Sequence, residues 1–450
     1  MIKRLFSFPL TWFLVFSFFV MSWPFVFFPL TDGDIVNWAQ VSAEFRNTGQ
    51  FLVGGNDQGH GPLMAWTGAI FTSVFKHSFY WLNFFNLLMS LLGTYLVYTF
   101  SARIWKRPEV SSLATFLYST SLVTMYLAKT PMYDWPAAIL FFSFCGWYWL
   151  FVEEGNVGYL CLALVSVGIG SLSRFSILLG LSGFFVIGAT FVYKRSFLSM
   201  VRDGLLVLGA VALANFPWLW GQLTAHGDSF LKTFLYDNTG RYVKSTRPDA
   251  VVRRDYYGFP LYVLVGMLPH TFCLVASFFR REFIDRVKEN KSYQMCLLAI
   301  LPCLILFSFS GHTKLARYIA YVFPPIMMLL AHNLALFDLA NPRFRNACKK
   351  MMFGTVVVLA VLLGIQVVQF SSEVQEGMLF SISVVVFLFS LIFVTYFLVA
   401  KRYSELATQS HRFLWMYSIV YGAFFTVLAY ESVHAPFLKG VREGILRAIW

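Results

Sequence analysis

Long uncharged apolar runs, separated by short charged segments, recur along the chain of 450 residues. The first of them extends from Leu5 to Thr31 without a single charge and follows Lys3 and Arg4. A transmembrane helix needs about 20 such residues, whereas the apolar core of a cleaved signal peptide is shorter. This run therefore predicts an uncleaved membrane span whose N-terminus lies in the cytoplasm.

The same length criterion finds about 13 candidate spans, which predicts an all-α polytopic membrane protein. The composition agrees, because 58% of the residues are hydrophobic and only 13% are charged. Soluble domains average about 45–50% apolar and about 25% charged residues, so both a soluble globular protein and a disordered chain are excluded. The predicted spans are 9–30, 79–101, 110–128, 136–152, 156–172, 175–193, 203–222, 258–279, 293–310, 315–337, 351–371, 378–399 and 413–431.

The distribution of Lys and Arg predicts the orientation of these spans, because loops on the cytoplasmic side carry more of both. With the N-terminus inside, the inner segments hold 20 Lys and Arg and the outer segments hold 15, of which six lie in 223–257. The net charge of +13 therefore indicates contact with membrane lipids and no nucleic acid. The long segments 31–78 and 223–257 face outside, where we expect any chemistry.

We expect one transmembrane domain, 1–431, followed by a short outer tail, 432–450. Within the outer loop 31–78, Ile35, Trp38 and Phe45 recur at helical spacing, and a second apolar stretch follows Pro62 but is too short to span. Both stretches are expected to be interfacial helices that lie on the membrane surface.

Two carboxylates stand at the outer mouth of the predicted bundle, Asp34 after the first span and Asp134 before the span 136–152. Each precedes a predicted helix, and Asp is a good helix N-cap. A carboxylate beside an apolar cavity is also suited to general-base catalysis. Position alone leaves both interpretations open.

Cations gather on the same predicted face. The segment 223–257 is expected to be an outer lid loop, with Tyr236 and Tyr257 interleaved among cations that include Arg241 and Arg254. Such a mixture fits anionic lipid contact, a phosphate-binding lid or stacking on a sugar.

Four further basic side chains are expected on this face. Lys314 and Arg317 lie one turn apart, so they share a helix face and either snorkel to the interface or hold a phosphate. Arg174 is a similar but weaker case. His60, in a sharp turn before Pro62, is either a surface histidine or a phosphate contact.

The motifs around these residues resemble those of GT-C membrane glycosyltransferases, in particular the lipid A aminoarabinose transferases and the protein O-mannosyltransferase-like family. The resemblance covers about 30–340, lacks the family's C-terminal soluble domain, and implies a GT-C bundle and a polyprenyl-phosphate sugar donor. Its motifs are Asp34…Trp38-Ala39-Gln40, His60-Gly61-Pro62-Leu63, Asp134-x-Pro136, Tyr236-Asp237-Asn238 with Tyr256-Tyr257-Gly258, and Lys314-Leu315…Tyr318…Pro324-Pro325.

The resemblance also implies roles for the candidate residues. Asp34 and Asp134 would be catalytic, as the base or as its support. The carrier phosphate would be bound by His60, Arg241, Lys314 and Arg317, and the substrate by Trp38, Tyr236, Tyr257 and Arg254. A divalent metal is possible in the family, but Asn238 and Gly59 stand where its relatives have metal ligands, so no metal site is predicted.

The sequence thus predicts an inverting glycosyltransferase of a bacterial inner membrane, with its active site facing the periplasm. It would move one sugar from a polyprenyl-phosphate carrier to an envelope acceptor such as lipid A, a glycan or a protein. A lipid-linked-sugar flippase is the main alternative, since it too needs cations for a phosphate. Transporters usually place such groups near the midplane, whereas these residues gather at the outer rim. A non-catalytic assembly partner is the third possibility.

Overall fold

The fold is that of a computed structural model, which describes most of the chain between residues 33 and 335. The described residues are 33–53, 61–74, 82–128, 130, 132–240, 258–267, 270–278, 281–309 and 316–335, with isolated positions at 10, 14, 17, 18 and 21. The predicted spans 351–371, 378–399 and 413–431, the tail 432–450 and most of the span 9–30 lie outside them.

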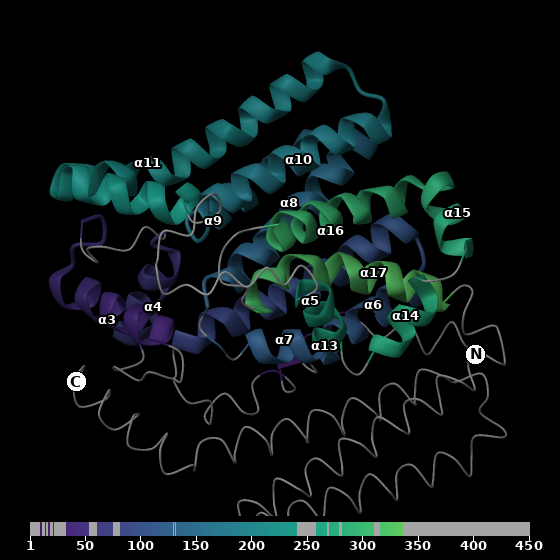
Figure 1. The fold of residues 1–450 in the computed structure, drawn as a ribbon, viewed down its shortest axis with the longest axis horizontal. Helices are drawn as coiled ribbons and strands as arrows, with labels where there is room; N and C mark the ends of the chain where they lie inside the picture. Colours follow the sequence, from purple (N-terminus) through teal and green to yellow (C-terminus); the bar gives the residue numbers. More distant parts are fainter. Residues whose placement is uncertain are drawn as a thin grey trace, which may run out of the picture.

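The described residues form helices and contain no β-strand, as predicted from the composition (Figure 1). Five of these helices are long and apolar enough to cross a membrane. The elements are α3 (Gly33–Thr48), α4 (Leu63–Val74), α5 (Leu82–Trp105), α6 (Pro108–Thr120), α7 (Leu122–Leu127), α8 (Asp134–Glu154), α9 (Val157–Ser171), α10 (Phe175–Tyr193), α11 (Phe197–Leu235), η2 (Tyr236–Gly240), α13 (Gly258–Gly266), α14 (Thr271–Phe278), α15 (Arg281–Glu289), α16 (Lys291–Phe309), η3 (Ala316–Val322) and α17 (Phe323–Asn333).

Both stretches that were expected to be interfacial helices are helical. α3 contains Ile35, Trp38 and Phe45 and ends at Thr48, after which Gly49 takes a positive φ of 68°; glycine adopts this left-handed conformation without steric cost. α4 covers the second stretch, and the two helices lie side by side at one edge of the bundle (Figure 1).

Two predicted spans are interrupted. The span 110–128 is divided at Ser121 between α6 and α7, and 258–279 is divided between α13 and α14. Ser121 has an extended backbone (φ −75°, ψ 144°), which stops one helix and starts the next.

The expected outer loop 223–257 was placed too early in the sequence. α11 continues to Leu235, and the π-helical turn η2 extends to Gly240. The helix changes direction at Gly227, whose φ of 57° and ψ of −133° are non-helical, so the apolar span is followed by a second helical segment instead of a loop. Residues 241–257 lie outside the described part.

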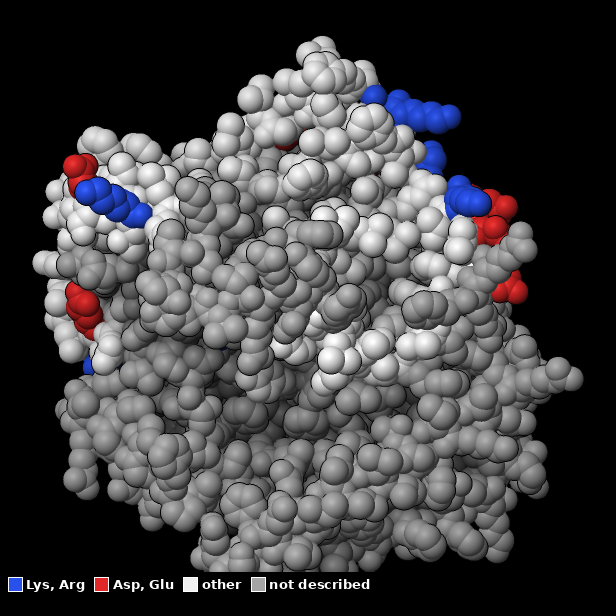
Figure 2. All heavy atoms as spheres, viewed as in Figure 1, with Lys and Arg blue, Asp and Glu red and all other residues white. Residues whose placement is uncertain are grey.

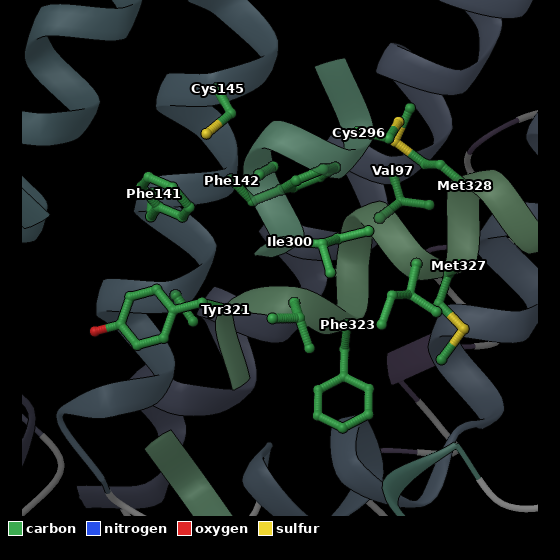
Figure 3. Packing of buried hydrophobic residues seen from close by; sticks show 14 of the residues in the cluster. Val97, Phe141, Phe142, Cys145, Cys296, Ile300, Tyr321, Phe323, Met327 and Met328 are labelled. Atoms are coloured by element: carbon green, nitrogen blue, oxygen red, sulfur yellow. The ribbon is translucent and has the colours of Figure 1, made fainter. Parts of the chain in front are cut away.

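The core is formed where α8 meets α16, η3 and α17. Phe141 of α8 lies with its ring centroid 5.9 Å from that of Tyr321 in η3, and Ile300 of α16 and Phe323 belong to the same buried cluster (Figure 3). In a membrane the apolar surroundings give little hydrophobic driving force, so close packing of this kind supplies the stabilisation. The packing fixes the start of α8 relative to η3.

In the view of Figure 2, the charged residues that are coloured lie toward two opposite edges. At the end of α8 away from Asp134, Asp203 is fully buried and ion-paired to Arg195 at 2.7 Å and to Arg202 at 2.8 Å. The hydroxyl of Tyr148 also donates to this carboxylate, at 2.8 Å. These contacts form a buried cluster at one end of the bundle, and a second buried cluster lies at the other end.

Candidate functional site

Asp134, Arg174 and Arg317 form the second cluster. Nε of Arg174 donates to Oδ1 of Asp134 at 2.8 Å, and Nε of Arg317 lies 3.2 Å from Oδ2. The carboxylate side chain is fully buried, while Arg174 is 5% and Arg317 10% exposed. One carboxylate therefore holds two guanidinium groups, and the three side chains together carry a net charge of +1.

All three residues stand at helix boundaries on one side of the bundle. Asp134 is the first residue of α8, Arg174 is the N-cap of α10, and Arg317 is the second residue of η3. The N-cap of α8 is Tyr133, so the interpretation of Asp134 as a helix cap is wrong. Its carboxylate pairs with arginines instead, although an acidic group in a first turn also complements the helix dipole.

Aromatic rings hold the two guanidinium groups. The Arg174 head lies 3.9 Å from the ring centroid of Tyr133 and 5.5 Å from that of Tyr318. Arg317 lies 5.9 Å and 5.8 Å from the same two rings. Such cation–π contacts contribute about 2 kcal/mol when water is excluded. Burial raises the pKa of Tyr133 well above its ordinary value, and Arg174 offsets only part of that shift, so the ring stays neutral.

The turn that carries Arg174 is joined to both neighbouring segments. Ser173 donates from Oγ to the carbonyl of Tyr133 at 2.6 Å, and the carbonyl of Leu172 accepts from the backbone N–H of Leu63 at 3.1 Å. A Cβ at Gly61 would overlap that same Leu172 carbonyl. The start of α4 therefore lies directly against the Arg174 turn, and only glycine fits at position 61.

The turn that follows α3 is held by three side chains, one from α4 and two from α11. The carbonyl oxygens of the consecutive residues 51–53 accept, in order, from Trp66 Nε1 at 2.7 Å, Gln222 Nε2 at 3.1 Å and His226 Nε2 at 2.9 Å. Since a carbonyl only accepts, His226 must carry its proton on Nε2. These three hydrogen bonds join the segment after α3 to α4 and to the helix that precedes the basic segment 241–257.

Only part of the predicted site falls within the described residues. Asp134 and Arg317 are in direct contact. Trp38 is 3% exposed, and its ring meets Tyr133 edge-on at 5.5 Å, so it reaches the cluster through that ring. Tyr236 is half-buried in η2, which lies against α10. Asp34 is the second residue of α3; its side chain, and the residues His60, Arg241, Arg254, Tyr257 and Lys314, lie outside the described part.

Proteins of similar sequence include undecaprenyl phosphate-alpha-4-amino-4-deoxy-L-arabinose arabinosyl transferases. The one from Aeromonas hydrophila is 26% identical over 349 residues, which is 74% of this chain and 62% of the relative. One from Pseudomonas fluorescens is 22% identical over 328 residues, 71% of this chain and 55% of the relative. The chain thus spans less than two thirds of the length of these relatives. A family model for dolichyl-phosphate-mannose-protein mannosyltransferase matches residues 59–220.

Among solved structures, ArnT from Cupriavidus metallidurans bound to undecaprenyl phosphate matches 94% of this chain and 77% of its own, with a TM-score of 0.74 at 15% identity. The chain has the GT-C fold. An oligosaccharyltransferase from Archaeoglobus fulgidus shares it more distantly, with a TM-score of 0.51 at 12% identity over 93% of this chain and 56% of its own. The resemblance predicted from the motifs is confirmed, and the chain is an integral membrane protein.

The described part of this GT-C bundle does not offer a metal site. No three His, Cys, Asp or Glu side chains come together among the described residues. Asn238 donates its amide nitrogen to the carbonyl of Phe234 at 3.0 Å.

Sequence reasoning underestimated two residues of this GT-C site. Arg174 was ranked below Lys314 and Arg317, and Tyr133 was not selected at all. Both stand in short polar breaks between apolar runs, Tyr133 before Asp134 and Arg174 after Ser173. A search of every such break on one predicted face would have found them, but only the fold shows that they meet.

Proposed function

We propose that the chain is an inverting glycosyltransferase that moves a monosaccharide from a polyprenyl-phosphate carrier to an envelope acceptor on the outer side of a bacterial inner membrane. The observation that carries the proposal is the buried cluster of Asp134, Arg174 and Arg317, with its net positive charge at the end of the bundle beside α3 and α4. The similarity to transferases named for undecaprenyl-phosphate-linked sugars supports the same reaction.

The reaction needs a base for the acceptor and cations for the leaving group. In the proposed step, the acceptor oxygen forms a bond to the anomeric carbon while the bond from that carbon to the phosphate oxygen breaks. Asp34 takes the acceptor proton, and polyprenyl phosphate leaves with one more negative charge than it had in the donor. Fixed cations that face this developing charge lower the barrier, because they need no reorganisation.

The described cluster fits the second requirement. Arg317 is the more exposed of the two arginines and would meet the phosphate together with His60, Arg241 and Lys314. Each carboxylate oxygen of Asp134 is ion-paired to one of the two arginines, so we assign Asp134 as a positioning residue that orients them. Trp38, Tyr236, Arg254 and Tyr257 would shape the sugar and acceptor sites.

The proposal is tested by incubating purified protein, wild type and Asp34→Asn, with membrane extracts that contain polyprenyl-phosphate sugars. The mass of each acceptor is then followed. A gain of one sugar mass with the wild type alone supports the transfer and the role of Asp34.

A second experiment separates the transferase from a flippase. Reconstituted vesicles with a labelled lipid-linked sugar report whether the carrier crosses the bilayer. Translocation of the carrier without any change in acceptor mass would overturn the transferase proposal.

A further inference from the structure

We propose that Asn86 is a positioning residue for the Asp134–Arg317 pair, an inference that rests on the proposed function of that cluster. Asn86 is fully buried near the start of α5. Its side-chain amide faces the segment between α7 and α8, which leads directly into Asp134.

The Asn86 amide nitrogen donates to three backbone carbonyls of one short stretch. These belong to Leu127, at 3.4 Å, to Thr130, and to Met132, at 3.1 Å. Leu127 is the last residue of α7, whose terminal carbonyls have no partner within the helix. One side chain therefore caps α7 and fixes the backbone up to two residues before Asp134.

Met132 connects the hydrogen bonds of Asn86 to Arg317. While its carbonyl accepts from Asn86, its sulfur accepts from Nη1 of Arg317 at 3.4 Å, and Nε of the same guanidinium lies 3.2 Å from Asp134. Met132 therefore contacts both the Asn86 amide and the Arg317 guanidinium. A shift of the Met132 backbone would move both the sulfur and the neighbouring carboxylate.

α5 and α8 are joined again one turn further along α5. Nε1 of Trp135 donates to Oγ of Ser90 at 2.6 Å, and Ser90 in turn donates to the carbonyl of Asn86 at 2.8 Å. α5 therefore holds the residues on both sides of Asp134. The carboxylate is positioned by the helix that packs beside it and not by α8 alone.

The test compares Asn86→Ala with Asn333→Ala. Asn333 is equally buried and hydrogen-bonded, to Arg286 and Tyr293 at 2.7 Å each. It lies beside His332, whose ring stacks on Trp105. Trp105 is 19 residues beyond Asn86 on α5, which is roughly 28 Å at 1.5 Å per residue. Both variants lose a buried amide, but only Asn86 is next to the cluster.

For each variant, thermal melting is measured in detergent, and KM for a polyprenyl-phosphate sugar donor is measured apart from kcat and from KM for the acceptor. We expect the donor KM of Asn86→Ala to rise at least tenfold, while that of Asn333→Ala stays within twofold. A general loss of folded protein would lower the rate without changing KM.

Asn86→Ser, which retains one donor, should give an intermediate donor KM. If Asn86→Ala does not fold, Met132→Leu keeps the Asn86 contacts, removes the sulfur acceptor, and should raise the donor KM several-fold. An unchanged donor KM in both Asn86→Ser and Met132→Leu would overturn the inference. Absence of sugar transfer by the wild type would instead overturn the proposed function.

Discussion

Arg174 and Asp134 are 40 residues apart in the sequence, yet Nε of the arginine lies 2.8 Å from Oδ1 of the carboxylate. They meet because α8 leads away from this end of the bundle and α9 returns to it. Arg317 reaches the other oxygen of the carboxylate at the start of η3. The cluster therefore depends on three helix boundaries that coincide in space.

Replacing Asp134 by Asn should destabilise the protein and weaken donor binding together. Removing one partner of a buried ion pair typically costs about 3–5 kcal/mol, because the remaining charge is left uncompensated. Here two arginines would lose their carboxylate. Thermal melting in detergent and the donor KM measure the two effects.

Asp203→Asn is the matched control, since Asp203 is also fully buried and ion-paired to two arginines but lies at the opposite end of the bundle. We expect a comparable loss of thermal stability and no change in donor KM. If both variants changed the donor KM equally, the assignment of Asp134 to donor binding would be wrong.

Replacing Tyr133 should separate its ring from its hydroxyl. The ring faces Arg174 at 3.9 Å and contacts Trp38. Tyr133→Phe keeps both ring contacts and should retain turnover within a few-fold. Tyr133→Leu removes them and should lose about 2 kcal/mol of guanidinium stabilisation, seen as a rise in donor KM of more than tenfold. Equal values for the two variants would contradict a role for the ring.

Gly61→Ala tests the contact between α4 and the Arg174 turn. The new methyl would overlap the Leu172 carbonyl and force the two backbones apart, at a cost of about 1–3 kcal/mol for an overpacked site. We expect lower thermal stability and lower kcat/KM. Gly180→Ala is the control, because nothing lies within 4 Å of a Cβ at that position; alanine there should be neutral or slightly stabilising in a helix.

The sequence predicted the helical class and the two helices α3 and α4 within the segment 31–78. These features follow from local hydrophobic periodicity. The pairing of Asp134 with Arg174 was not predicted, because contacts between distant helix ends leave no periodic signal. The sequence does not predict the extension of α11 past residue 222, for a different reason. The apolar run ends there, but the chain changes direction at Gly227 and remains helical.

Asp34→Asn should reduce turnover without affecting the fold. A catalytic base contributes about 10²–10⁴-fold to the rate, and asparagine preserves the size of the side chain in the first turn of α3. We therefore expect kcat to fall at least a hundredfold while thermal melting and donor KM stay near the wild-type values. Asp32→Asn, two residues earlier, is the matched control and should leave kcat unchanged. Wild-type turnover in folded Asp34→Asn protein would mean that another group accepts the proton and that the role assigned to Asp34 is wrong.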